Sequence, residues 1–270
     1  MAIITYWNDG KNETGQSMTI AAVATAMAWN YNYKVLIVNT KHADPSLEFA
    51  FEQKNNVNRI FSKGKMDLAT GLSGVAKAIM SNKTSPEIIT NYTKVIWKNL
   101  ELLTDKDITD EEFEKFIKYI KEIIKLANRY YDMVFVDLEG PIDDPQISEI
   151  LSMSTINVVT LTQNINVLDR FKEYKGFFRD MELFVSIGRY DDKSKYTVKN
   201  VSKYINEKKV FAVPYNTMLA MEAPEGKLDD FFINFRNVKG AHPNAPLIEA
   251  VNDQAHKIVD TIKAQQRKIY

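Results

Sequence analysis

The sequence predicts an α/β protein in which a mostly parallel, twisted sheet carries helices on both faces. Short apolar runs rich in β-branched residues, typical of buried strands, alternate with longer segments of helical periodicity. Such alternation builds strand–helix–strand units whose strands run parallel. A glycine-containing turn joins the first strand to the first helix, where unpaired N–H groups and the helix dipole favour anions. With 270 residues, 45% of them hydrophobic, the chain can form this fold as a single domain over residues 1–270.

The expected elements alternate along the whole chain. Strands are predicted at residues 2–7, 33–39, 100–104, 133–137, 156–162, 182–187 and 209–213. Helices are predicted at residues 19–28, around 47–51, 66–79, 110–127, 166–178, 197–205 and about 245–267. The helix from residue 110 opens with acidic residues and continues with apolar residues at spacings of three and four, which indicates a helix packed on the sheet.

Composition excludes several classes of function. Lysine plus arginine equals aspartate plus glutamate at 35 each, so net charge gives no support to DNA binding, although a local basic patch stays possible. The absence of cysteine excludes disulfides, zinc–thiolate sites and thiol catalysis, and three scattered histidines show no metal-ligand spacing. With no long apolar run and no signal-like N-terminus, we expect a cytoplasmic protein.

The C-terminal helix carries an apolar stripe followed by a few basic residues. Basic residues beside an apolar face can bind a membrane surface. Because this helix contains no tryptophan or phenylalanine and its basic cluster is small, we expect the stripe to dock on the sheet instead.

The turn at residues 8–19 is the strongest functional signal. In the phosphate-binding pattern G-x-x-x-x-G-K-[ST], glycines let backbone N–H groups face the phosphates, a lysine reaches the β and γ oxygens, and a hydroxyl holds Mg²⁺. Gly10, Gly15 and Ser17 fit this pattern, but Gln16 stands in place of the lysine. An ordinary strand-to-helix turn is the alternative. The residues expected to cradle phosphates are Gly10, Lys11, Asn12, Glu13, Thr14, Gly15, Gln16, Ser17 and Met18.

Lys11, directly after the first glycine, gives this turn a closer likeness. Residues 11–17 resemble the deviant Walker A loop, K-G-G-x-G-K-[ST], of the ParA/MinD family of partition and positioning ATPases. The resemblance implies a P-loop NTPase fold, ATP and Mg²⁺ as cofactors, and a homodimer in which Lys11 contacts the partner subunit's nucleotide. The sequence departs from the family at Asn12, Glu13 and Gln16. Glutamine can still donate a hydrogen bond but brings no charge to the phosphates, so hydrolysis is expected to be slow or lost.

The end of the second strand shows another loss of charge. Family members have an acidic D-x-D pattern there, and the matching positions are Asn39, Thr40 and Lys41. Asp44 follows shortly and could substitute for the missing acid, so it joins Lys11 as a candidate catalytic residue. Alternatively, Asp44 only caps the start of the next helix.

Asp137 ends an apolar strand and resembles the Walker B aspartate. The resemblance implies that Ser17 and Asp137 hold Mg²⁺. Residues 139–145 then form a turn-rich loop whose counterpart senses the γ-phosphate, or an acidic surface loop without such a role.

Later segments resemble parts of the family that surround the base. Arg189 follows one predicted strand in a loop at residues 188–191, and Pro214 and Tyr215 follow another, so these three residues are candidate base contacts. Ordinary turns are the alternative. Residues 188–196 and 213–216 are more similar to the branch of TadZ/CpaE-like pilus-localisation proteins than to plasmid partition ATPases.

Two functions follow from these observations. The first is an ATP-binding, dimerising switch with slow hydrolysis that positions DNA or a protein assembly. The second is a non-catalytic scaffold that holds nucleotide as a structural ligand and binds protein partners, such as pilus or conjugation machinery. A dehydrogenase is a distant third, since the glycines do not follow G-x-G-x-x-G.

Overall fold

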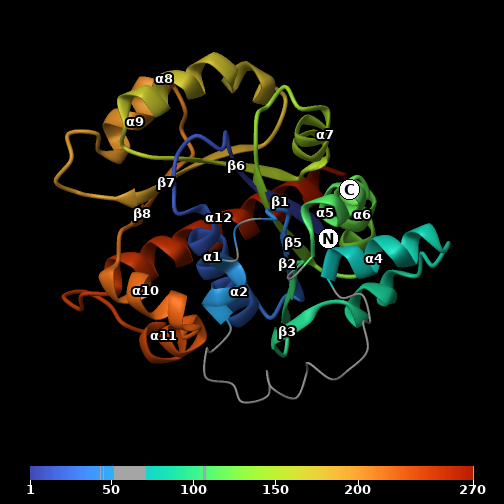
Figure 1. The fold of residues 1–270 in the computed structure, drawn as a ribbon. Coiled ribbons are helices and arrows are strands. Elements are labelled where there is room, and N and C mark those ends of the chain that lie inside the picture. The colour runs from blue at the N-terminus through green and yellow to red at the C-terminus, as the bar shows by residue number, and fades with distance from the viewer. Residues whose placement is uncertain (43, 45, 52–70, 106–107, 270) are drawn as a thin grey trace.

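The computed structural model describes residues 1–42, 44, 46–51, 71–105 and 108–269 of the protein. An eight-stranded sheet runs through these residues, in the order β3-β4-β2-β5-β1-β6-β7-β8 (Figure 1). Neighbouring strands are parallel throughout, except that β3 runs antiparallel to β4. The strands are β1 (Ala2–Asn8), β2 (Val35–Asn39), β3 (Lys94–Trp97), β4 (Leu100–Leu103), β5 (Met133–Glu139), β6 (Ile156–Leu161), β7 (Leu183–Tyr190) and β8 (Val210–Pro214).

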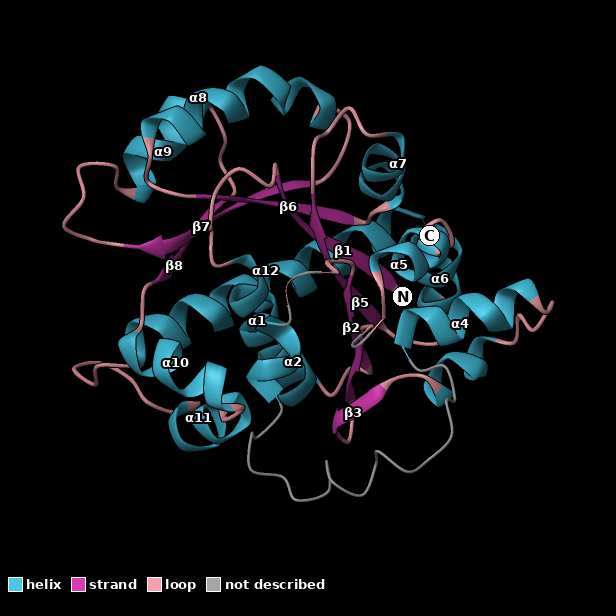
Figure 2. Cartoon of the chain, viewed as in Figure 1, coloured by secondary structure: helices cyan, strands magenta, loops and turns pink. Residues whose placement is uncertain are grey.

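Helices cover both faces of the sheet (Figure 2). One layer contains α1 (Gln16–Tyr31), α2 (Ser46–Phe51), α10 (Thr217–Glu222), α11 (Leu228–Phe235) and α12 (Ala245–Ile269). The other contains α4 (Gly71–Met80), α5 (Asp110–Ile117), α6 (Ile120–Asn128), α7 (Pro145–Met153), α8 (Ile165–Tyr174) and α9 (Val198–Ile205). Short 3₁₀ segments lie at Pro86–Asn91, Lys175–Phe178 and Ala223–Glu225.

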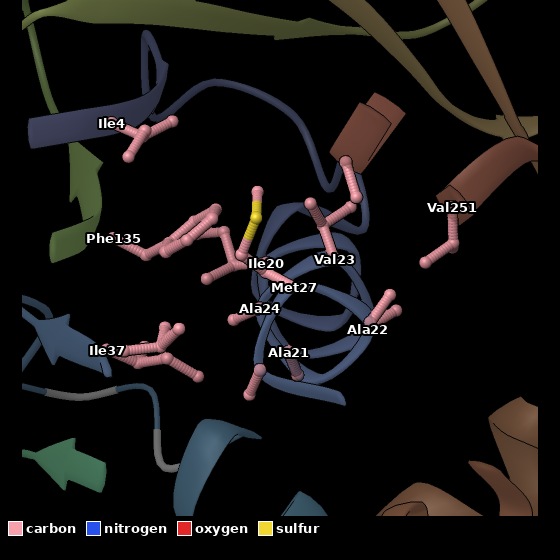
Figure 3. Close-up of a cluster of buried hydrophobic side chains, with 14 of the residues drawn as sticks. Ile4, Ile20, Ala21, Ala22, Val23, Ala24, Met27, Ile37, Phe135 and Val251 are labelled. Atoms are coloured by element: carbon pink, nitrogen blue, oxygen red, sulfur yellow. The ribbon is translucent and has the colours of Figure 1, made fainter. Parts of the chain in front are cut away.

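The core is divided by the sheet, because successive residues of a strand point to opposite faces. Ile4 and Tyr6 of β1 pack in the layer of α1 and α12, whereas Ile3 and Trp7 pack in the opposite layer. Helix α1 lies between sheet and α12, and its residues 19–28 are all buried. Figure 3 shows side chains from the sheet on one side of α1 and Val251 of α12 on the other. This packing holds the N-terminal end of α1 at the carboxyl edge of the central strands.

The predicted fold class is confirmed, and so is each predicted strand to within a few residues at its ends. Two predicted helices differ in detail. The apolar stripe at residues 110–127 is shared by α5 and α6, because the chain tightens at Tyr119, whose N–H donates to the carbonyl of Phe116. The helix predicted at residues 66–79 begins at Gly71 in the described part of the chain, and residues 66–70 lie outside it.

The sequence did not predict β3, α7, α10 or α11. Strand β3 is short and half-exposed, so it lacks the apolar run that marks the buried strands.

The C-terminal helix docks on the protein, as expected. Its stripe is at most 5% exposed and packs against α1 and the sheet; the residues are Leu247, Ile248, Val251, Ala255, Ile258, Val259 and Ile262. Among the described helices, none combines the length and the apolar character that crossing a bilayer requires.

Candidate functional site

The loop between β1 and α1 forms a cradle at the carboxyl edge of the sheet. Gly10 and Gly15 adopt left-handed backbone angles, with φ of 73° and 74°, which favour glycine. Among the described residues, none accepts a hydrogen bond from the backbone N–H groups of residues 12–18. The Thr14 hydroxyl is buried and likewise has no partner there. Unpaired donors at a helix N-terminus form an anion site, so the loop fits a phosphate group.

A cavity of about 590 Å³ opens over this cradle. Residues 10–18 line it, together with Lys41, Asp44, Ser46, Glu139 and Arg189. All nine residues predicted to cradle phosphates are therefore brought to one cavity. Glu139 and Lys41, which the resemblance had matched to separate elements around the phosphates, line the same cavity.

The side chain of Gln16 is used within the protein. Its Nε2 donates to Asp137 Oδ1 at 2.6 Å and to the carbonyl of Leu138 at 2.9 Å. Its Oε1 accepts from Asn8 Nδ2 at 3.1 Å, and the residue is only 2% exposed. The sequence-based expectation that this amide still offers a hydrogen bond to phosphate is therefore at odds with the geometry. The backbone N–H of Gln16 is one of the unpaired donors of the cradle, whereas its side chain bonds α1 to the end of β5.

Lys41 reaches into the same group of side chains from the end of β2. Its Nζ lies 3.0 Å from Asp137 Oδ1 and 3.1 Å from Ser17 Oγ. The carboxylates of Glu139 and Asp44 are also close, at 3.4 and 3.6 Å. Burial alone would lower the pKa of Lys41, but Asp137, Glu139 and Asp44 outweigh burial and raise its pKa above the ordinary value. Lys41 is thus charged at neutral pH.

Asp44 does come close to the site, as the sequence allowed. Its Oδ2 lies 3.4 Å from Ser17 Oγ, and its Oδ1 accepts from the backbone N–H of Ser46 at 3.0 Å. Burial opposes ionisation of Asp44, but the hydrogen bonds from Ser46 and the nearby Lys41 lower its pKa overall. The side chain of Asp44 therefore both bonds the first residue of α2 and lines the cavity.

Ser17 and Asp137 are brought together, but the arrangement does not fit Mg²⁺. Ser17 Oγ donates to Asp137 Oδ2 at 2.6 Å, and both residues contact the ammonium of Lys41. Magnesium binds oxygen at about 2.0–2.1 Å, so an ion on Ser17 would lie within about 5 Å of Lys41 Nζ. At that distance a divalent ion and an ammonium repel each other, and Asp137, the carboxylate expected to attract the ion, is already bonded to Lys41, Gln16 and Ser17.

Lys11 lies at the rim of the cavity with its side chain exposed. Its backbone N–H donates to Asp9 Oδ1 at 3.1 Å. Two arginines hold the surrounding loop, Arg170 on Asp9 at 2.8 Å and Arg189 on Glu13 at 3.1 Å. The sequence had not singled out Arg170, because its partner lies 161 residues away in the chain.

A second, mostly apolar cavity of about 310 Å³ adjoins the first. Gly15, Met18, Ser46 and Arg189 line both cavities. The predicted base contacts Arg189, Pro214 and Tyr215 all lie in this lining, and α10 adds residues that the sequence did not indicate, Leu219 and Ala220.

The prediction of a loop at residues 188–191 is wrong, because the strand continues to Tyr190. Residues 188–190 belong to β7, whose register with β8 shifts between Ile187 and Tyr190. Arg189 has a positive φ of 50° at this irregularity. A Cβ added to Gly188 would lie 1.9 Å from the carbonyl oxygen of Thr14, so β7 and the phosphate loop touch backbone to backbone.

No protein-family model and no curated protein matches the chain. Solved structures do. A ParA family ATPase from Chlorobium tepidum aligns over 93% of this chain and 98% of its own, with 17% identity and a TM-score of 0.71. The chain has the fold of the ParA and MinD ATPases. The cell division ATPase MinD of Pyrococcus furiosus has 16% identity and a TM-score of 0.70, with 96% of this chain and 99% of its own covered.

A third structure carries a ligand. The septum site-determining protein MinD of Pyrococcus horikoshii, complexed with Mg-ADP, aligns over 96% of both chains with 14% identity and a TM-score of 0.69. Cell division is named for the Pyrococcus furiosus MinD and septum-site determination for the Pyrococcus horikoshii MinD, and the Mg-ADP belongs to the latter structure. The likeness in fold extends across almost the whole chain.

Proposed function

We propose that the protein binds ATP in the two adjoining cavities and acts as a ParA/MinD-like positioning or partitioning protein with slow or absent hydrolysis. The observation that carries this proposal is the phosphate cradle of residues 10–18 with its unpaired backbone N–H groups. The apolar cavity next to it has the lining expected for a base.

Impaired hydrolysis follows from two side chains. Phosphoryl transfer depends on charges placed around the γ-phosphate. Gln16 brings none, and its amide is bonded to Asp137 and Leu138. Lys41 occupies the position where the resemblance expects an acid. If hydrolysis is absent, the proposed protein is a scaffold that holds nucleotide and acts by binding protein partners.

A working ATPase is the second candidate, and Asp44 favours it. Its carboxylate faces Ser17 at 3.4 Å and has a lowered pKa, so it is an ionised acid at the edge of the phosphate cavity. A base or water-orienting carboxylate would need this placement.

The remaining parts of the proposal concern partners. A homodimer with nucleotide at its interface rests on Lys11, which is exposed at the rim of the cavity. We propose a cargo from pilus or conjugation machinery because residues 188–196 and 213–216 are similar in sequence to TadZ/CpaE-like proteins. The net charge of zero gives no support to DNA as the cargo. A cytoplasmic location is part of the proposal because the sequence contains no long apolar run.

Calorimetric titration with ATP and with ADP, run beside a phosphate-release assay on the same preparation, tests the proposal. Binding with little or no phosphate release is expected. Rapid turnover would favour the ATPase candidate, and the absence of binding would contradict both.

Replacement of Gln16 by lysine separates the two candidates. We expect Gln16→Lys to gain affinity but little turnover, because Lys41 still stands where an acid is needed. A large rise in phosphate release by Gln16→Lys alone would show that the remaining machinery is intact. Lys193→Met, which changes an exposed charge at neither cavity, is the control for altered net charge.

A further inference from the structure

Hydrogen bonds from Asn39 and Thr40 fix the turn after β2 and orient Lys41 toward the loop between β1 and α1. Asn39 Oδ1 accepts from the backbone N–H of Lys41 at 3.0 Å, and Asn39 Nδ2 donates to the carbonyl of Asp44 at 3.2 Å. Thr40 Oγ1 donates to the carbonyl of Asp137 at 2.7 Å. The turn after β2 is thereby tied to β5, and the Lys41 side chain, 11% exposed, points at Ser17.

The ammonium of Lys41 has the surroundings of a bound cation. A hydroxyl and a carboxylate lie within hydrogen-bond distance, and two more carboxylates lie within 3.6 Å. These are hard oxygen ligands of the kind that otherwise hold magnesium. Ser17 donates its proton to Asp137 and faces Lys41 with its lone pairs, so both sides of the hydroxyl are used.

The positive charge that the pattern places at position 16 is absent there, but Lys41 brings a positive charge to the same cavity. The phosphate-loop pattern calls for lysine at position 16, where this chain has glutamine, and the second strand carries Lys41 where the resemblance expects an acid. Gln16 and Lys41 both bond Asp137 Oδ1, at 2.6 and 3.0 Å, so the two replacements meet on one oxygen atom. Each change is compatible with the other, and Lys41 lines the phosphate cavity.

We propose that the Lys41 ammonium is the resident cation of the phosphate cavity in place of magnesium, so that ATP binds without a divalent ion. This inference rests on the proposed nucleotide binding and goes beyond it. A phosphate oxygen at the floor of the cavity takes a charge-assisted hydrogen bond from Lys41 Nζ. Asp137, Glu139 and Asp44 keep the lysine in place when the cavity is empty.

Calorimetry on the wild-type protein tests the inference without any substitution. ATP is titrated once with excess MgCl₂ and once with excess EDTA. We expect the two dissociation constants to agree within about threefold, since magnesium adds no contact. Binding that requires magnesium would overturn the inference and leave nucleotide binding standing. Absence of binding in both buffers would overturn nucleotide binding, and the inference with it.

Three variants at position 41 sharpen the result. Lys41→Met keeps the length of the side chain without its charge, and its ATP affinity in EDTA should fall about tenfold or more, the value of one charge-assisted hydrogen bond. Lys41→Arg keeps the charge and should stay independent of magnesium. Lys193→Met should behave as wild type. Unchanged affinity of Lys41→Met in EDTA would contradict the role of the ammonium.

Thermal unfolding with magnesium alone gives a readout that needs no nucleotide. Magnesium should leave the Tm of the wild-type protein unchanged and raise that of Lys41→Asp, which adds a fourth carboxylate and removes the ammonium. An equal rise in both proteins would show that magnesium and Lys41 coexist, against the inference.

Discussion

Several buried polar side chains of this protein meet at one carboxylate, and their hydrogen bonds fix how the strands and helices around it are placed. Gln16, Ser17 and Lys41 converge on Asp137, which is fully buried. Tyr131 shows the same principle away from the site. Its hydroxyl donates to Glu101 Oε2 at 2.6 Å, and the two residues are 0% and 7% exposed. A buried carboxylate without its donors is costly, so removing one partner has a measurable effect.

Tyr131→Phe is expected to lower the free energy of unfolding by about 1.5–3 kcal/mol, the range for a hydrogen bond to a charged group. Urea unfolding at neutral pH measures the change. Tyr130→Phe, at the neighbouring half-exposed position, should stay within about 0.5 kcal/mol of wild type. Equal effects of the two substitutions would contradict the assigned role of the Glu101 contact.

The same tyrosine makes stability depend on alkaline pH. Burial, together with the Glu101 carboxylate, raises the pKa of Tyr131 above its ordinary value. Above about pH 10 the unfolded chain loses this proton while the folded chain keeps it, so the free energy of unfolding falls as pH rises. The stability difference between wild type and Tyr131→Phe should therefore shrink above about pH 10. A constant difference from neutral pH upwards would contradict this.

At the scale of secondary structure, the site depends on how closely the elements approach one another. Helix α1 is buried along residues 19–28, and its small side chains let it sit tightly between the sheet and α12 (Figure 3). Its N-terminus is thereby fixed at the end of β1. On the other side, β7 supports the phosphate loop at Thr14, where no side chain fits between the two backbones.

Gly188→Ala is expected to displace the phosphate loop, because the added Cβ would lie 1.9 Å from Thr14 O. Such overpacking costs about 1–3 kcal/mol, which corresponds to roughly a tenfold or greater rise in the Kd for ATP if the loop absorbs the shift. Calorimetry with ATP and urea unfolding measure the two consequences separately.

Gly176→Ala is the matched control for this substitution. A Cβ at Gly176 meets no atom within 4 Å, so both affinity and stability should stay close to wild type. If Gly188→Ala also left both quantities unchanged, the loop would not depend on β7.

At the scale of the whole molecule, both cavities open at the carboxyl edge of the sheet, where the ends of β1, β2, β5, β7 and β8 meet. Parallel sheets bring such ends together because all their strands end on the same side. Lys11 is exposed at the rim of this edge and, among the described residues, has no ion-pair partner. A second subunit facing this rim would meet it first.

Lys11→Ala is expected to bind ATP within about twofold of wild type and to lose ATP-dependent dimerisation, because the proposed contact of its ammonium is with the nucleotide of the partner subunit. Light scattering with and without ATP measures the mass in solution. Lys193→Ala serves as a control for the change in net charge. Dimerisation that persists in Lys11→Ala would contradict the proposed contact across subunits.

The sequence by itself determined the fold class, the positions of the buried strands along the chain and the glycine turn between β1 and α1. These features depend on local signals: apolar runs mark strands buried on both faces, and glycine spacing marks a turn that needs positive φ. Strand β3 and helices α10 and α11 were not predicted from the sequence, because their burial depends on distant neighbours rather than on a periodic pattern of their own.

Only the tertiary structure decided what Gln16 and Lys41 do. In the sequence they are two separate losses from a motif, 25 residues apart. In the fold they share one oxygen of Asp137, since parallel pairing sets β5 between β1 and β2. Local sequence records which charge is missing, but a charge supplied from another strand becomes visible only when the strands lie side by side.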